Sequence, residues 1–271
     1  MNIDAVSRSA TKQAIFEGLE KNQFELRYQP FIDLQTGQIA AAETLLRWHH
    51  PQQGQVMPSD VIQIAEDTGQ IIAIGKWVIE QAAKQLQNWQ SLVSTDFRLA
   101  INVSARQLHD ESLLETLSRL PDILVSKLDF EITETAFLDK HHNVMDCLEL
   151  IRKKGGKISL DDFGMGYSSL HLLLKFPVDT IKIERTFLAH DLSQERHAAL
   201  VDAIFSLARS VGAHVVAEGV ETTDKIDFLI ARNCARAQGF IYSKPLTAGD
   251  FGSLYDANKA KRLALNPGHS S

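Results

Sequence analysis

Apolar and polar residues alternate along a short stretch near the start of the chain. Phe24, Leu26 and Tyr28 alternate with polar residues, and a second strand fits residues 39–45. The segment 33–37 between them has the composition of a turn. A link this short cannot hold the helical crossover that joins parallel strands, which takes about a dozen residues or more. We therefore predict an antiparallel hairpin at the start of the fold.

Helical patterns and short apolar strands then alternate over the rest of the chain. Pro58 begins one helix and Gly69 ends it, and a longer helix that carries Trp77 and Leu86 follows. Another helix is indicated by apolar residues at the i, i+3, i+4, i+7 spacing, Ile204, Leu207, Ala208 and Val211. Six strand candidates lie among the helices: 99–103, 128–132, 158–160, 180–183, 214–217 and 239–242.

The hairpin and the six later strands together predict an α/β fold of eight strands. The closed solution for that pattern is a (β/α)8 TIM-like barrel with an irregular, antiparallel first strand. An open doubly wound sheet is the competing fold. No G-x-G-x-x-G segment follows a strand and no Walker A segment exists, which disfavours a nucleotide-binding sheet. We expect an N-terminal lead-in over 1–15, the barrel over 16–256 and a flexible C-terminal tail over 257–271.

Composition excludes several classes of protein. Of the 271 residues 44% are apolar and 23% are charged, which is ordinary for a globular protein and unlike collagen or disordered chains. A net charge of −6 argues against binding duplex nucleic acid. The only cysteines, Cys147 and Cys234, provide neither a disulfide framework nor a zinc ligand set, so we expect a reducing, cytoplasmic compartment. No apolar run approaches the roughly 18–20 residues of a membrane span.

Polar side chains recur where the predicted strands end. In a barrel these ends converge on one face, where barrel enzymes place their chemistry. Each position alone is typical of a solvated loop or a helix N-cap, but the whole ring crowds carboxylates that need a compensating cation. Oxygen ligands favour Mg²⁺ or Mn²⁺, and two metals about 4 Å apart suit phosphoester hydrolysis. The ring comprises Glu43, Asn102, Glu131, Glu134, Asp161, Asp162, Lys182, Glu218, Glu221 and Gln238.

These residues sit in short motifs whose order and spacing resemble one known family. The motifs are YQP at 28–30, ETLLRW at 43–48, NVS at 102–104, EITE at 131–134, DDFGMGYSS at 161–169, IKIE at 181–184, AEGVET at 217–222 and QGF at 238–240. Together they resemble the EAL domain family, bacterial phosphodiesterases of cyclic di-GMP. The resemblance covers nearly the whole chain, and eight motifs in order are far more specific than any one.

The resemblance implies hydrolysis of cyclic di-GMP to linear pGpG, which lowers a bacterial second messenger, with two Mg²⁺ or Mn²⁺ ions per site. It also implies a homodimer, and a sensor or GGDEF domain in a longer parent chain. Lys182, Glu218 and Glu43 match catalytic positions, and Glu134 matches a residue that anchors the loop after the fifth strand. The implied metal ligands are Glu43, Asn102, Glu131, Asp161, Asp162 and Glu218. The implied substrate-binding residues are Gln29, Leu45, Arg47, Gln238 and Glu221.

Three positions depart from the family pattern, and two other functions stay open. Thr44 stands where the family has alanine, Met165 where it has threonine or alanine, and Glu184 where it has aspartate. None of the three removes an implied metal ligand. One alternative is a catalytically weak or inactive cyclic di-GMP receptor of the same fold. The other is an unrelated barrel enzyme in which Lys182 forms a Schiff base. We interpret the pair His49 and His50 as part of an exposed loop before Pro51.

Overall fold

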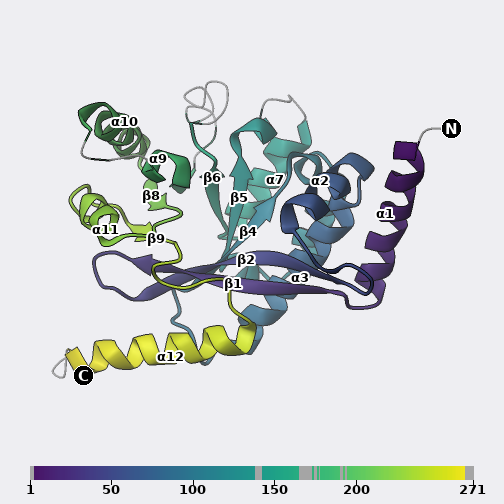
Figure 1. Ribbon diagram of the computed structural model, residues 1–271, viewed down its shortest axis with the longest axis horizontal. Helices are drawn as coiled ribbons and strands as arrows, with labels where there is room; N and C mark the ends of the chain where they lie inside the picture. The colour runs from purple at the N-terminus through teal and green to yellow at the C-terminus, as the bar shows by residue number, and fades with distance from the viewer. Residues whose placement is uncertain are drawn as a thin grey trace.

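The protein folds as a barrel with helices around it, described by a computed structural model for residues 3–137, 142–164, 173, 176, 178–189, 192 and 194–265 (Figure 1). Within these residues, eight strands close the barrel in the order β1-β9-β8-β7-β6-β5-β4-β2, and the short strand β3 extends β2 outside it. The predicted barrel is confirmed. The barrel strands are β1 (Phe24–Asp33), β2 (Ile39–His50), β4 (Arg98–Val103), β5 (Leu128–Thr133), β6 (Lys157–Asp161), β7 (Thr180–Ile183), β8 (His214–Ala217) and β9 (Arg236–Ala237).

The strand pairing makes the first unit irregular, as the hairpin predicts. β1 pairs antiparallel with β2 and with β9. The other barrel pairs are all parallel: β2–β4, β4–β5, β5–β6, β6–β7, β7–β8 and β8–β9. Because β1 runs against the other strands, its last residue, Asp33, lies at the end of the barrel where the parallel strands begin. The carboxyl ends of the parallel strands therefore meet on the opposite face.

The hairpin is longer than its alternation predicted. β2 continues past residue 45 to His50 and pairs with β3 (Gly54–Val56), with His49 opposite Gln55 and His50 opposite Gly54. The interpretation of this histidine pair as loop was therefore wrong. Proline at position 51 ends β2 but does not prevent the preceding residues from pairing. The β1–β2 ribbon consequently extends well beyond the barrel wall, as the purple strands in Figure 1 show.

The helices lie on the outside of the barrel. α2 (Pro58–Thr68) ends as predicted, with Gly69 in the left-handed conformation at φ 79°. The predicted helices after it are α3 (Ile71–Asn88) and α10 (Glu195–Val211). The remaining helices are α4 (Ala105–Leu108), α5 (Glu111–Arg119), α6 (Asp122–Val125), α7 (His142–Lys153), α9 (Arg185–Ala189), α11 (Thr223–Ile230) and the 3-10 turn η1 (Glu134–Phe137). None of the described helices is both long and apolar enough to cross a bilayer.

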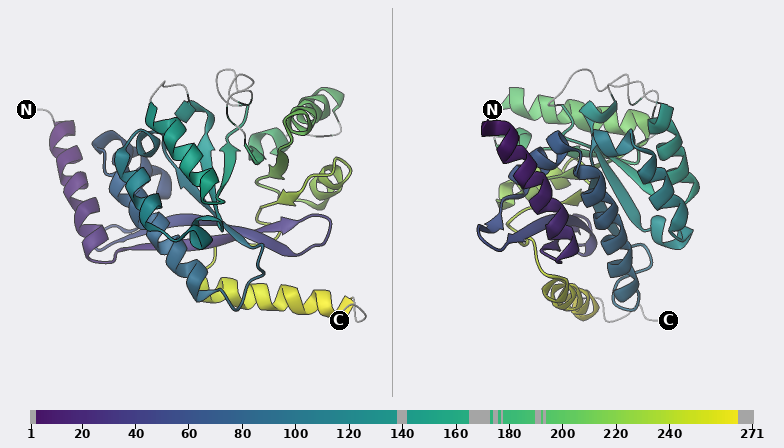
Figure 2. Two further views of the ribbon diagram at one scale, coloured as in Figure 1. Left: turned by 180° about the vertical axis from the view of Figure 1, so that it is seen from behind. Right: turned by 90° about the vertical axis from the view of Figure 1, so that its right-hand side faces the viewer.

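Two long helices occupy the two ends of the described chain. α1 (Ile3–Glu20) lies against α2, and α12 (Ala248–Leu265) lies against the outer side of β1 and β2 (Figure 2). The expected domain boundaries at 15/16 and 256/257 both fall inside these helices. Residues 257–265, which we expected in a flexible tail, are helical.

An aromatic cluster attaches α12 to the first strand. Tyr28 meets Trp89 edge-on with ring centroids 4.8 Å apart, and Trp89 stacks on Phe251 of α12, also at 4.8 Å. The backbone of Tyr28 also exchanges two hydrogen bonds, of 2.8 and 2.9 Å, with Leu246, just before the helix. Aromatic pairs of this kind add about 0.5–1.5 kcal/mol each beyond their buried area. The cluster therefore fixes β1 directly beside Gln29, which belongs to the candidate site.

The predicted last strand is misplaced. The eighth strand is the two-residue β9, and the predicted segment 239–242 forms a turn in which the Tyr242 amide donates to the Gly239 carbonyl at 3.1 Å. Gly239 crosses so close to Val220 that a Cβ there would lie 1.9 Å from the Val220 carbonyl oxygen. The apolar run after Gly239 resembles a strand, but this close crossing turns the chain instead. Gln238 therefore directly follows the end of β9, as Glu218 directly follows the end of β8.

Candidate active site

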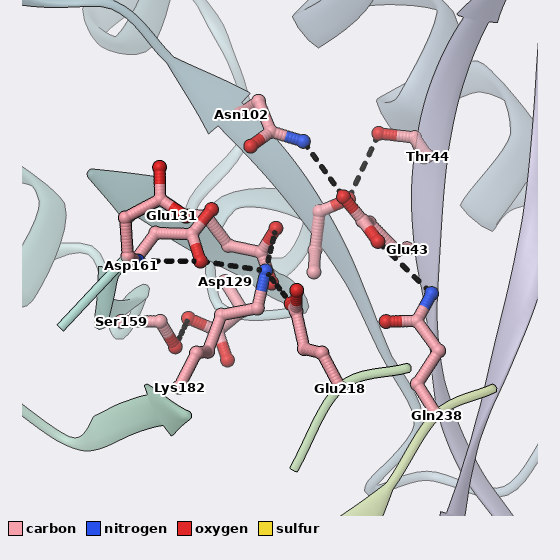
Figure 3. A network of polar contacts seen from close by, with 12 residues as sticks. Glu43, Thr44, Asn102, Asp129, Glu131, Ser159, Asp161, Lys182, Glu218 and Gln238 are labelled. Atoms are coloured by element: carbon pink, nitrogen blue, oxygen red, sulfur yellow. Dashed lines mark hydrogen bonds and ion pairs between the residues drawn. The ribbon is translucent and has the colours of Figure 1, made fainter. Parts of the chain in front are cut away.

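A buried lysine lies at the centre of the carboxyl-end face. Lys182 of β7 is 2% exposed, and its Nζ lies 2.8 Å from Glu131 Oε2, 2.5 Å from Glu218 Oε1 and 3.3 Å from Asp161 Oδ1 (Figure 3). Glu131 is in β5, Asp161 ends β6 and Glu218 directly follows β8. The parallel register of these strands brings residues far apart in sequence to one level. The inward orientation of Lys182 agrees with its position between two apolar strand residues.

Glu43 of β2 is held by two amides beside this cluster. Asn102 Nδ2 donates to Glu43 Oε1 and Gln238 Nε2 donates to Glu43 Oε2, each at 2.9 Å (Figure 3). Gln238 Nε2 also lies 3.0 Å from Gln29 Oε1, and Gln29 Nε2 donates to the Ser243 carbonyl at 3.0 Å. Both oxygens of Glu43 are therefore oriented by fixed donors. These hydrogen bonds connect strands β1, β2 and β4 to the segment after β9.

Burial and mutual repulsion keep protons in this cluster. Burial raises the pKa of Glu131 well above its ordinary value, and the carboxylates of Glu43, Asp161 and Glu218 raise it further. Burial likewise raises the pKa of Glu218 to about 7 despite the nearby ammonium. Burial alone would lower the pKa of Lys182, but Glu131 and the other carboxylates together raise it well above its ordinary value. Lys182 is therefore charged at neutral pH, and its charge lowers the pKa of Glu131 but does not cancel the effect of burial.

The donor set and the charge of the site fit a divalent cation. Glu131, Asp161 and Glu218 share the single ammonium of Lys182, and the carboxylate of Glu43 lies beside them. Four carboxylates around one ammonium leave room for the positive charge of a cation. All the available ligand atoms are carboxylate or amide oxygens, which suit Mg²⁺ or Mn²⁺. Among the described residues, no three His, Cys, Asp or Glu side chains already form a ligand group, and Lys182 lies between the carboxylates instead.

Two residues of the predicted site stand apart from the cluster. Asp162 is exposed and adopts a left-handed backbone with φ 53°, and its amide donates to Asp161 Oδ1 at 3.0 Å. Glu221 is exposed in the loop after β8. The structure brings neither side chain into the ion-pair network of Lys182 within the part of the chain it describes.

The predicted substrate residues follow one face of the hairpin. The register places Glu43 opposite Gln29, Leu45 opposite Arg27 and Arg47 opposite Glu25. Since every second residue of a strand faces the same side, Glu43, Leu45 and Arg47 form a row that leaves the carboxylate cluster. Arg47 is half-buried, and its Nη1 donates to the Leu46 carbonyl at 2.8 Å.

A cavity of about 430 Å³ adjoins the cluster on its β2–β4 side. Asn102 and Glu131 line it at the cluster, and Leu45 lines it along the hairpin. The far wall is apolar, formed by residues of α2 and α3 that include Ile62, Ile71, Ile74 and Val78. The cavity therefore joins a mostly apolar wall to the polar residues of the cluster.

Glu134 has an unusual environment. It lies in η1 and is 2% exposed, and neither carboxylate oxygen has a hydrogen-bond partner in the described part of the chain. A buried carboxylate without donors is costly, so a donor is required there. The loop that we expect Glu134 to anchor falls mainly in 165–172, outside the described residues, as does Met165.

The other two departures from the motif pattern are accommodated. Thr44 is buried, and its hydroxyl donates to the Ala100 carbonyl at 2.8 Å. The Thr186 hydroxyl donates to the carboxylate of Glu184 at the end of β7. Neither residue contacts Lys182 or Glu43 through a polar group in the described structure.

The sequence reasoning missed a buried polar layer below Lys182. Ser159 Oγ donates to Asp129 Oδ1 at 2.7 Å, and the two residues are 1% and 8% exposed (Figure 3). Each lies two positions before a cluster carboxylate, Asp161 and Glu131 respectively, and so points into the same barrel. That i, i+2 spacing was the signal available in the sequence.

A TIM-like barrel whose carboxyl-end face gathers carboxylates around a buried lysine belongs to the class of barrel enzymes. The pattern of the EAL domain matches residues 12–245, and the chain belongs to this family. It is 36% identical over 254 residues to the bifunctional diguanylate cyclase/cyclic di-GMP phosphodiesterase MucR of Pseudomonas aeruginosa, covering 92% of this chain and 37% of MucR. It is 34% identical over 242 residues to the cyclic di-GMP phosphodiesterase PdeR of Escherichia coli, covering 88% of this chain and 36% of PdeR.

Solved structures agree with these sequence relatives. The structure of the EAL enzyme Bd1971 in its cAMP- and cyclic-di-GMP-bound form superposes with a TM-score of 0.86 at 33% identity, covering 93% of this chain and 70% of that one. The chain spans only 31–38% of the length of the first curated relatives it matches. The shared part is therefore one domain of those longer proteins.

Proposed function

We propose that this domain hydrolyses cyclic di-GMP to linear pGpG with the help of divalent cations, Mg²⁺ or Mn²⁺, two per site. The observation that carries the proposal is the buried ammonium of Lys182 between Glu131, Asp161 and Glu218, beside the oriented carboxylate of Glu43. The printed names of MucR and PdeR and the ligand in the Bd1971 structure support the substrate. In this reaction water forms a bond to one phosphorus, and the 3′ oxygen leaves with a proton.

The protein's own residues divide the work. Bound divalent cations supply Lewis acidity, which neutralises phosphoryl oxygens and lowers the pKa of water. Glu43, Asn102, Glu131 and Asp161 would hold the first cation, and Asp162 with Glu218 the second. Glu218, with its pKa near 7, accepts or releases a proton at its carboxylate around neutral pH. Lys182 keeps a fixed positive charge where negative charge develops on the phosphate.

Substrate positioning falls to the hairpin and its neighbours. Arg47 offers its guanidinium to a phosphate, and Leu45 offers an apolar surface at the mouth of the cavity. Gln29 and Gln238 are already joined by a hydrogen bond, so they present their remaining amide atoms to the nucleotide in a fixed orientation. We include Glu221 as a further nucleotide contact, and Glu134 as the anchor of the loop after β6.

The same relatives suggest the wider setting. We infer a barrel domain over 16–256 within a longer cytoplasmic parent protein that carries a sensor or GGDEF domain, and assembly as a homodimer. Size-exclusion chromatography with light scattering tests the dimer directly. A monomer at every concentration with full activity would remove it.

The experiment that tests the function is incubation of the pure protein with cyclic di-GMP and Mg²⁺, with nucleotides separated by chromatography. We expect pGpG to accumulate, and no product from Lys182→Met. Lys84→Met on the exposed face of α3 is the matched control and should behave as wild type. Tight binding of cyclic di-GMP without any product, in protein that is fully folded, would replace hydrolysis by a receptor function.

A further inference from the structure

A second large cavity opens at the opposite end of the barrel. Its volume is about 560 Å³, and the first residues of several strands are part of its lining. Arg98 begins β4, Lys157 begins β6, His214 begins β8 and Arg236 begins β9. This end faces away from the carboxyl-end cluster, so the two cavities do not share an opening.

Cationic side chains outnumber carboxylates around this cavity. The cations are Arg98, Arg152, Lys157 and Arg236, and the carboxylates are Asp33, Asp129 and Asp179. Each carboxylate already has donors of its own. Asp179 accepts from Lys157 Nζ at 2.6 Å and from the Ile158 amide at 3.0 Å, and Asp129 accepts from Ser159 at 2.7 Å.

The third carboxylate, Asp33, accepts its hydrogen bonds within the β1–β2 turn. Asp33 Oδ1 accepts hydrogen bonds from the amides of Gln35 and Thr36 at 3.1 and 2.8 Å, and from the Thr36 hydroxyl at 2.8 Å. These local bonds hold the Asp33 side chain over the β1–β2 turn. Asp33 and Arg236 are paired along the backbone, but no ion pair joins their side chains in the described structure.

Arg98 and Arg236 therefore have guanidinium N–H groups without a hydrogen-bond partner among the described residues. In the described part of the chain, no carboxylate oxygen lies within 4.0 Å of a guanidinium nitrogen of Arg98 or Arg236. Arg98 makes one long hydrogen bond, 3.4 Å, to the Leu128 carbonyl, and the Arg236 side chain makes none with these residues. Burial lowers the pKa of Arg98, the carboxylates of Asp129 and Asp179 offset part of this effect, and the charge of Arg236 lowers the pKa further. Two half-buried guanidinium groups that repel each other across a cavity favour a shared anion.

We propose that this cavity binds a phosphomonoester, with the phosphate held between Arg98 and Arg236. Guanidinium groups bind phosphate through two parallel hydrogen bonds, and two of them neutralise its double charge. The volume lies within the range of small-molecule sites, about 300–1,000 Å³. The side chains of Val178, Val211 and Val216 give part of the wall an apolar surface against which the organic portion of the ligand packs. The site is separate from the proposed hydrolysis and does not depend on it.

The test uses inorganic phosphate and guanosine monophosphate as probes, titrated by calorimetry in a chelating buffer so that no metal-bound phosphate contributes. We expect saturable binding of both probes. Arg98→Gln and Arg236→Gln should each weaken binding by about tenfold or more, because each removes one charge-assisted pair of hydrogen bonds. Lys153→Gln, on the exposed side of α7 and outside the cavity lining, is the matched control and should bind as wild type.

Two further variants keep the test decisive. Arg98→Lys and Arg236→Lys retain the charge but lose the forked geometry, so they should bind more weakly than wild type and more tightly than the glutamine variants. They also replace the glutamine variants if those fail to fold. Lys182→Met should not change the affinity of either probe, which separates this cavity from the carboxylate cluster. Equal affinity in wild type and in all folded arginine variants, or no binding at all, would overturn the proposal.

Discussion

The two ends of the barrel are built from the same strands but differ in charge. At the carboxyl end, one buried ammonium is shared by three carboxylates, and burial together with the neighbouring carboxylates raises the pKa of Glu131 and Glu218. At the other end, the carboxylates have donors of their own, and neither Arg98 nor Arg236 forms an ion pair with a described carboxylate. Under the two proposals above, one mouth of the barrel binds cations and the other binds an anion.

Single strands show how close together the two environments lie. β5 carries Asp129 and Glu131 two residues apart, and the first accepts from Ser159 whereas the second pairs with Lys182. Two residues span only about 7 Å along a strand. The difference therefore depends on the neighbouring strands at each level and not on the composition of β5.

The largest effect should come from removing the central charge. Lys182→Met leaves the carboxylates without their ammonium, so turnover of cyclic di-GMP should fall by about 10²–10³-fold. The metal-free protein should also lose about 3–5 kcal/mol of unfolding free energy at about pH 8, because the remaining charges are buried and unpaired. Chromatographic rates and urea unfolding measure the two effects. Unchanged stability together with unchanged turnover would show that the carboxyl-end cluster is not an electrostatic centre.

The next effect tests the oriented carboxylate. Glu43→Ala removes the acceptor shared by Asn102 and Gln238, and we expect turnover to fall about a hundredfold or more while the fold is kept. Initial rates at saturating Mg²⁺ and a circular dichroism spectrum check both parts. Thr44→Ala, the adjacent buried position without a polar contact to the cluster, is the matched comparison and should stay within about threefold. Near wild-type rates for Glu43→Ala would remove Glu43 from the site.

Exchanging the metal should change the activity of the carboxyl-end site. Activity should require Mg²⁺ or Mn²⁺, and Ca²⁺ should permit nucleotide binding but lower the rate about a hundredfold, because its oxygen bonds are longer, about 2.3–2.6 Å. Rates with each metal, and calorimetry with cyclic di-GMP, measure both properties. Full activity in a chelator contradicts the metal requirement, and equal rates with Ca²⁺ contradict the geometric explanation.

The smallest effect is a pH dependence of stability in the metal-free protein. Glu218 has a pKa of about 7 when folded, against an ordinary value of 4.5. Between these two values the folded state keeps a proton that the unfolded state has lost, so this contribution to stability is full at low pH and disappears as the pH rises through about 7. Glu218→Gln should flatten this slope in urea unfolding from about pH 5 to 8. Glu80→Gln, on the exposed face of α3, should leave the slope unchanged, and a wild-type slope in Glu218→Gln would refute the assignment.

Local patterns of apolar and polar residues predicted much of the fold. The short link 33–37 predicted the hairpin, and the alternation of helices and strands predicted the barrel. β9 could not be predicted, because two residues carry no periodicity and the apolar run after Gly239 gives a false strand signal. The extension of β2 to His50 depends on pairing with β3, and the continuation of α12 beyond residue 256 is likewise not signalled locally.

The candidate site likewise contains residues that the sequence predicted and residues that it did not. Strand-end positions such as Lys182 and Glu131 could be named because the strands could be placed. The Ser159–Asp129 bond and the convergence of Arg98 with Arg236 could not, because they depend on the register between strands. Asp162 and Glu221 were named from the motif pattern, and both lie on exposed loop segments rather than in the Lys182 network.

The register of the β1–β2 hairpin also sets a length scale for the ligand. Glu43 and Arg47 lie four residues apart on one face of β2, which corresponds to about 13–14 Å along an extended strand. A molecule that engages both residues must therefore be long and open, with one charged group near each position. A compact cyclic mononucleotide is shorter than this spacing between the two backbone positions. Under the proposed roles of Glu43 and Arg47, the spacing along one strand favours long ligands before any base is recognised.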